Sequence, residues 1–225
     1  CKKESGIVKW LEQEKKKLTG LSRKAKLEYV WQYYKLWLIG GAALILFGIY
    51  FGFHLVNANR DTHLYVGFVN TYADVGNDSD FWKNYVEYSQ TDIDEENVIF
   101  DKEMYFDMTQ GDVRGNHYYE KLVVLIDSKT LDAVVTETEN LRSLGANGRL
   151  LDLNNERADR FMEKYEDRII TAAVDQEDGT TREVPIGIDI SDSILMTEED
   201  AYVGGCAIGI SSHAEHLDAL LEFLD

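Results

Sequence analysis

The chain has 225 residues, with 23 basic and 41 acidic side chains and a formal net charge of -18. This balance excludes a nucleic-acid-binding surface, which requires a basic face. Apolar residues make up 44% of the chain, which is enough for a buried core, so the acidic composition does not indicate disorder.

The N-terminal part of the chain is basic. Residues 1–35 carry ten basic and four acidic side chains, a net charge of +6. Apolar residues at intervals among the lysines of residues 7–21 predict an amphipathic helix that lies on an anionic membrane surface. Ser22 is a favourable N-cap, and no Gly or Pro follows before the apolar segment, so we expect one continuous helix over residues 23–56.

Residues 36–59 contain no Asp, Glu, Lys or Arg. At about 1.5 Å per residue, a helix over residues 36–56 is roughly 30 Å long, which matches the hydrocarbon core of a membrane. We therefore predict a transmembrane helix at residues 36–56. The residues after it carry a net charge of -24, so the positive-inside bias places the N-terminus in the cytoplasm and the C-terminal part outside the cell membrane.

Two forms of processing are alternatives to this anchor. A cleaved signal peptide usually has an apolar core of about 7 to 15 residues near the start of the chain. The apolar segment here is longer and follows 35 residues, so an uncleaved anchor is favoured. An acylated Cys1 would require an extracellular N-terminus, which conflicts with the lysines that follow it.

Three glycines of the predicted span lie on nearly the same helix face: Gly41, Gly48 and Gly52. Small residues in such a row allow a second helix to approach closely, and they predict a dimer or a contact with a partner helix. A chance occurrence in a glycine-rich span is the alternative.

A short linker at residues 57–62 leads to residues 63–225, which suffice for one domain. Apolar runs and alternation predict strands at residues 63–70, 98–106, 131–135, 168–174, 183–190 and 202–210. Helical periodicity predicts helices at residues 78–89, 115–128, 139–144, 156–166 and 213–224. Strands separated by helices favour right-handed crossovers, so we predict a three-layer, mostly parallel α/β sheet. One antiparallel addition comes from a hairpin that turns at Asp178 and Gly179.

Motifs of known chemistry are few in this domain. The sequence has no Walker loop, GxGxxG, GxSxG or HExxH, so it indicates no enzyme class and no cofactor. His213 and His216 could share a metal ion, but no convincing third ligand accompanies them. The acidic residues of 74–80 could hold Ca²⁺, although their spacing departs from that of an EF-hand. Cys206 is the only cysteine after the span, so no intramolecular disulfide can stabilise the domain.

The candidate binding site follows from the predicted sheet, because ligands of open α/β sheets bind at the carboxyl ends of the strands. Polar residues follow two of the buried strands there. They are Asn70, Thr71 and Tyr72 after the first strand, and Thr136, Glu137 and Thr138 after the third. Ordinary loop polarity explains these side chains equally well.

Three segments carry a resemblance to known proteins. LDAVVT at 131–136, followed by LGANGRLLDL at 144–153, resembles the segment of extracellular solute-binding proteins in which a strand ends at the ligand cleft. Residues 202–225 resemble the strand and helix by which those proteins return to their first lobe. Residues 18–37 are similar to uncharacterised single-pass membrane proteins of Gram-positive anaerobes. The domain has room for one lobe only, so the resemblance implies a membrane-anchored, single-lobe relative without a closing cleft.

The resemblance implies a non-enzymatic single-pass membrane protein that presents a solute-binding-like lobe outside the cell. Such a protein would be an accessory or sensing subunit of a membrane complex such as an ABC-type transporter, with membrane lipid and a permease as partners. A free-standing receptor for a small molecule or peptide is one alternative. An enzyme whose active-site residues are dispersed along the chain is another.

Overall fold

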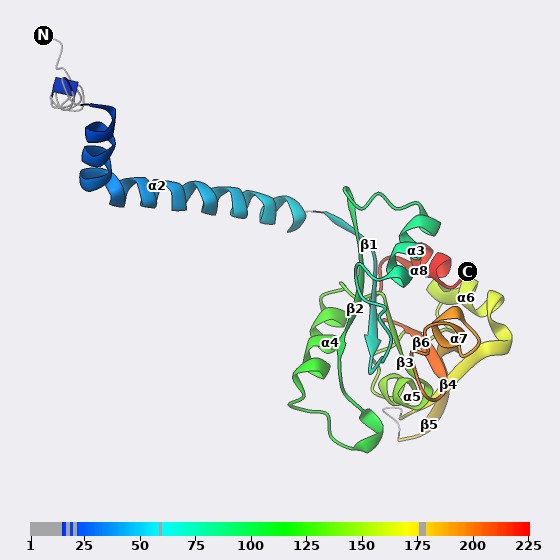
Figure 1. Cartoon of the computed structure of the whole chain (residues 1–225). Helices are drawn as coiled ribbons and strands as arrows, with labels where there is room; N and C mark the ends of the chain where they lie inside the picture. The colour runs from blue at the N-terminus through cyan, green and yellow to red at the C-terminus, as the bar shows by residue number, and fades with distance from the viewer. Residues whose placement is uncertain (1–14, 17–18, 20–21, 59, 176–178) are drawn as a thin grey trace, which may run out of the picture. The chain divides into compact units, whose positions relative to one another are not determined.

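The computed structural model describes residues 15–16, 19, 22–58, 60–175 and 179–225 (Figure 1). The chain divides into two units, Cys1–Asn59 and Arg60–Asp225. Most of the amphipathic helix expected over residues 7–21 lies outside the described residues, and so does Asp178 of the predicted hairpin turn.

The first unit contains one long helix, α2, which spans Arg23–Ala58. Ser22 precedes it and accepts a hydrogen bond from the backbone N–H of Ala25 at 3.3 Å, which confirms the predicted start of a continuous helix. Residues Tyr34–Gly52 are long and apolar enough to cross a membrane, and none of this window is buried. Signal sequences and core helices of soluble proteins can meet the same criteria, so this helix is a weak indication of a membrane anchor.

The second unit is built on a six-stranded sheet with the strand order β2-β1-β3-β6-β5-β4. The strands are β1 (Asp61–Val69), β2 (Glu96–Met104), β3 (Ala133–Glu137), β4 (Ile169–Asp175), β5 (Thr181–Asp189) and β6 (Cys206–Ile210). β1 pairs in parallel with β2 and β3, whereas β6 is antiparallel to both β3 and β5, and β4 is antiparallel to β5. Consequently β1, β2, β3 and β5 run in one direction, and β4 and β6 run in the other.

The sheet is therefore mixed, and the prediction of a mostly parallel sheet with one antiparallel addition needs correction. The β4–β5 hairpin, which was the predicted addition, is present. The difference comes from β6, which inserts between β3 and β5 and runs against both. Its apolar sequence indicates a central, buried strand, but carries no information about strand direction.

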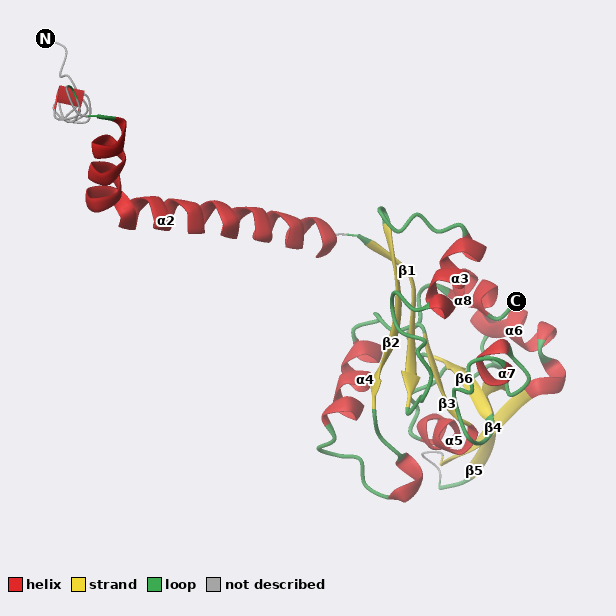
Figure 2. Ribbon diagram, in the orientation of Figure 1, coloured by secondary structure: helices red, strands yellow, loops and turns green. Residues whose placement is uncertain are grey.

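Helices cover both faces of the sheet (Figure 2), as the predicted three-layer arrangement requires. The helices are α3 (Asp80–Ser89), α4 (His117–Asp127), α5 (Thr138–Ala146), α6 (Asp159–Lys164), α7 (Ile194–Thr197) and α8 (Leu217–Phe223). α3, α6, α7 and α8 cover one face, here called the α8 face, and α4 and α5 cover the α5 face. The steps from β1 to β2 and from β2 to β3 move in opposite directions along the sheet. Right-handed crossovers therefore place α3 and α4 on opposite faces, as observed.

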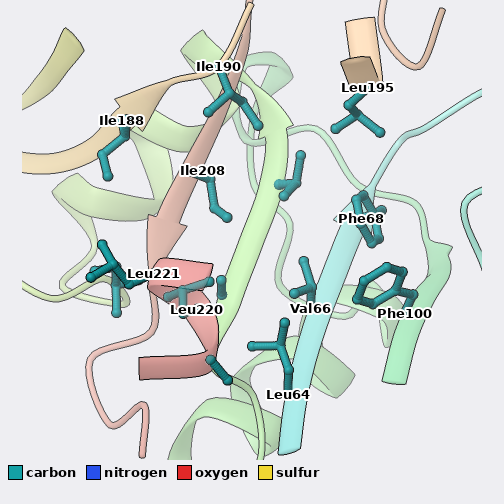
Figure 3. Packing of buried hydrophobic residues seen from close by; sticks show 14 of the residues in the cluster. Leu64, Val66, Phe68, Phe100, Ile188, Ile190, Leu195, Ile208, Leu220 and Leu221 are labelled. Carbon is teal, nitrogen blue, oxygen red and sulfur yellow. The ribbon is translucent and has the colours of Figure 1, made fainter. Parts of the chain in front are cut away.

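The core follows from the alternation of side chains along the strands. Leu64, Val66 and Phe68 of β1 contribute to the cluster under the α8 face, and Tyr65 contributes to the cluster under the α5 face. Figure 3 shows the first cluster, in which Val66 and Phe68 of β1 lie in one buried group with side chains from α8. The domain thus has apolar side chains packed on both faces of the sheet, which explains the near-continuous apolar runs of its central strands.

Several element boundaries differ from the predicted ones. The predicted helix at 156–166 is α6 flanked by two short 3₁₀ helices, Glu156–Ala158 and Glu166–Arg168. The predicted strand at 202–210 begins only at Cys206, and the helix predicted from residue 213 begins at Leu217. The loop before β6 is held to β3 through Tyr202, and the loop before α8 is held to Asp132, just before β3. Local periodicity does not report such tertiary contacts.

Candidate functional site

The structure brings the two predicted groups of polar residues to the same edge of the sheet. β1 and β3 are neighbours whose carboxyl ends lie together, and the chain leaves them in opposite directions, so this edge is the topological switch point. Both groups contact the loop of residues 198–205. Tyr72 donates its backbone N–H to the carbonyl oxygen of Ala201 at 3.1 Å, and Thr138 donates its backbone N–H to that of Gly205 at 3.2 Å.

This loop fills the crevice at the switch point. Ala201 is completely buried, and Tyr202 is 5% exposed. The Tyr202 hydroxyl donates to the carbonyl oxygen of Val135 on β3 at 3.0 Å. Burial of the phenol raises its pKa well above the ordinary value, so it stays protonated and remains a donor. The chain itself therefore occupies the place where the sequence predicts a ligand.

Side-chain hydrogen bonds engage three of the other predicted residues, Asn70, Thr71 and Thr136. Asn70 bonds both the N–H and the carbonyl oxygen of Phe106 through its side-chain amide, at 3.0 and 2.7 Å. Thr136 is buried and accepts a hydrogen bond from the Asn140 amide at 3.0 Å. Glu137 is half-buried at the end of β3. Tyr72, in contrast, is 78% exposed.

A hollow of about 630 Å³ lies near this edge on the α8 face, beside the carboxyl end of β5. We call it the larger hollow. Its apolar lining comes from β5 and from three helices. These residues are Phe81, Ile188, Ile190, Ile194, Leu195, Phe223 and Leu224. Ile188, Ile190 and Leu195 also belong to the buried cluster of Figure 3, so the base of the hollow is continuous with the core.

Charged side chains also line the larger hollow: Lys164, Arg168, Asp189, Asp192 and Asp225. Arg168 forms two hydrogen bonds to the two carboxylate oxygens of Asp192, at 2.6 and 2.7 Å. Such a bidentate pair has a fixed geometry. Lys164 forms an ion pair with Asp225. This arrangement of an apolar interior with a few charged groups is suited to binding an amphipathic ligand.

A smaller hollow of about 370 Å³ also has the Arg168–Asp192 pair in its lining. It shares Arg168, Asp189 and Asp192 with the larger hollow, and its lining includes Thr138 and Arg142 of α5. Thr138 is thus the predicted site residue that lines one of these two hollows. The others do not line either.

Among the described residues, no group of three or more His, Cys, Asp and Glu side chains could hold a metal ion. Neither of the two metal-binding alternatives therefore has a complete ligand set there. His216 is engaged by Asp132, whose two carboxylate oxygens both lie 3.0 Å from the ring Nδ1. In the acidic segment, Asp74 pairs with Lys102, and Ser79 accepts a hydrogen bond from the N–H of Trp82 as the N-cap of α3.

The glycine face of α2 is open. A Cβ added at Gly41, Gly48 or Gly52 would meet nothing within 4 Å. This leaves room for a second helix, so the predicted helix–helix contact stays a prediction.

Comparisons of the chain with protein-family models, with characterised proteins and with solved structures gave no match.

The predicted site residues include none from the larger hollow, because its lining comes from four distant stretches of the chain, at residues 81, 164–168, 188–195 and 223–225. Asp189 did have a local signal in the sequence, because it is an acidic residue near the end of an otherwise apolar strand. The pairing of Arg168 with Asp192 has no signal in the sequence, since it depends on how β4 and β5 pair.

Proposed function

We propose that the protein is a single-pass membrane protein whose α/β domain works by binding and not by turning over a substrate. It would be an accessory or sensing subunit of a membrane complex such as an ABC-type transporter. The lining of the larger hollow supports the binding role, because it combines apolar surface with charged groups. The resemblance of the C-terminal segment to a solute-binding lobe is consistent with this role.

The observation that carries the proposal is the short connection between the two units. α2 ends at Ala58 and β1 begins at Asp61. Two intervening residues span at most about 10 Å. A domain tethered this closely to a membrane helix stays at high effective concentration over any membrane protein that the helix contacts. The open glycine face of α2 offers such a contact within the bilayer.

In this proposal the N-terminus is cytoplasmic and the α/β domain lies outside the cell. The charge asymmetry of the chain supports that orientation, since the residues before the span carry +6 and those after it carry -24. The acidic domain is also repelled by anionic lipid headgroups, which favours a protein partner over the lipid surface as the domain's main contact.

A free-standing receptor is the second candidate function. The larger hollow favours it, because a volume of about 630 Å³ falls within the range of small-molecule sites. The two functions differ in whether the protein is found with a stable partner in the membrane.

Purification of the full chain from native membranes tests the proposal. We expect the wild-type protein, at native expression and in mild detergent, to bring a permease with it, as identified by mass spectrometry. Gly48→Leu is expected to weaken this recovery by separating the helix backbones. Gly40→Leu is the matched control, because Gly40 lies about a quarter turn around the helix from Gly48.

Recovery of the wild-type protein alone would contradict the accessory-subunit proposal and favour the receptor. Equal losses in Gly48→Leu and Gly40→Leu would show that the glycine face is not the contact. The enzyme alternative makes a different prediction. The chain would turn over a substrate, and replacing the charged residues that line its active site would abolish that turnover.

A further inference from the structure

The larger hollow combines aromatic rings with carboxylates. Phe81 and Phe223 belong to its lining, with ring centroids 6.3 Å apart and an interplanar angle of 83°. Tyr165 also lines it, and its hydroxyl donates to the carbonyl oxygen of Leu224 at 3.0 Å. Aromatic faces attract organic cations because the ring quadrupole is negative above and below the plane. Neighbouring carboxylates strengthen that attraction.

Two of the three carboxylates in the hollow are balanced by cations of the protein itself. Asp192 is paired with Arg168, and Asp225 with Lys164. Asp189 forms no ion pair with any residue in the described part of the chain; its carboxylate accepts a hydrogen bond from the backbone N–H of Ser191 at 2.8 Å. The hollow therefore contains one carboxylate that has no ion-pair partner among the described residues, although Arg168 lines the same hollow.

One ammonium group in the wall of the hollow already lies next to both an aromatic ring and a carboxylate. The Nζ atom of Lys164 lies 5.5 Å from the centroid of the Tyr165 ring and contacts the Asp225 carboxylate. An aromatic face and a carboxylate together thus bind a cation of this chain. Asp189 and the remaining aromatic lining offer the same two kinds of group to a cation from solution.

From these contacts we infer that the larger hollow binds a small organic cation, with its apolar body on the aromatic lining and its positive charge near Asp189. The inference rests on the proposed function, in which the domain works by binding. An anion is disfavoured because Arg168, a cation that could bind it, is already paired with Asp192 and would have to be released from that pair. The residues after the span also carry a net charge of -24, which repels anions and attracts cations.

Isothermal titration of the full chain in nanodiscs of zwitterionic lipid tests this inference with three probes that share one aromatic body. They are benzyltrimethylammonium, benzyl alcohol and benzoate, and empty nanodiscs provide the background. We expect benzyltrimethylammonium to bind at least tenfold more tightly than benzyl alcohol, and benzoate to bind most weakly. Asp189→Asn is expected to lower the affinity for benzyltrimethylammonium severalfold without changing that for benzyl alcohol.

Asp167→Asn is the matched control, because Asp167 lines only the smaller hollow, and it should leave the affinity for all three probes unchanged. If Asp189→Asn does not fold, the selectivity of the wild-type chain decides alone. Preferential binding of benzoate, equal binding of the three probes, or binding of none would each overturn the inference. These outcomes do not bear on recovery of a membrane partner, which tests the proposed function separately.

Discussion

The buried carboxylate of Asp132 is expected to be the most sensitive polar group of the α/β domain. It is completely buried and lies just before β3. Its oxygens accept hydrogen bonds from the backbone N–H of Tyr65 at 3.0 Å, of Glu215 at 3.2 Å and of His216 at 3.0 Å. The His216 ring adds a further contact at 3.0 Å. One side chain thus joins β1, β3 and the start of α8.

Asp132→Ala removes the acceptor for three backbone N–H groups at once. Each buried donor left without a partner costs about 1–3 kcal/mol. Because the His216 side chain is 32% exposed, water can reach part of the site, so each donor left without a partner should cost only about 1–2 kcal/mol. The free energy of unfolding should therefore fall by about 3–6 kcal/mol, which overlaps the cost of breaking a buried ion pair from one side. Asp132→Asn, which keeps one acceptor oxygen, should cost about half as much.

Urea unfolding of residues 60–225, followed by circular dichroism, measures this change. The control is Asp127→Ala, because Asp127 is 60% exposed and forms one ion pair, at 3.3 Å, with Arg149. A surface pair of this kind contributes about 0–1 kcal/mol. If Asp132→Ala and Asp127→Ala lower the free energy of unfolding equally, the carboxylate does not hold α8 to the sheet, and the reasoning is refuted.

Three further predictions concern the core, the thiol and the topology. Leu221→Asp should destabilise the domain by about 3–5 kcal/mol, because it places a carboxylate on the buried side of α8, and an unchanged melting temperature would show that α8 is not docked. Burial raises the pKa of the Cys206 thiol, so a thiol reagent should modify residues 60–225 only after unfolding; rapid modification of the folded domain would contradict this. Protease added to intact cells should remove the α/β domain and leave a membrane-bound fragment, whereas digestion of the lysine-rich N-terminal segment would reverse the proposed orientation.

The sequence predicted the elements of the domain more reliably than their arrangement. The apolar run that contains Leu64, Val66 and Phe68 predicted a strand covered on both faces, and β1 is buried in this way. The hairpin of β4 and β5 followed from alternation and from the turn residue Gly179, which has a φ of +81°. These features depend on neighbours along the chain, and so local patterns report them.

Features that depend on distant residues were not predictable in the same way. Asp132 is an acidic residue within an apolar run, a pattern that indicates a buried polar contact. The sequence does not identify the partners of its carboxylate. Its partners at Glu215 and His216 are more than 80 residues away. α7 is four residues long, too short for helical periodicity to show.

The position of the larger hollow follows from the direction of β6. Because β6 runs antiparallel to β3, it begins at the edge where β3 ends, and Cys206 lies opposite Glu137. The loop before β6 must therefore cross the carboxyl edge of β3, where Ala201 and Tyr202 fill the crevice between β1 and β3. A parallel last strand would have begun at the opposite edge and left that crevice open. The larger hollow lies farther along the sheet, beside the end of β5, and its lining includes Asp189.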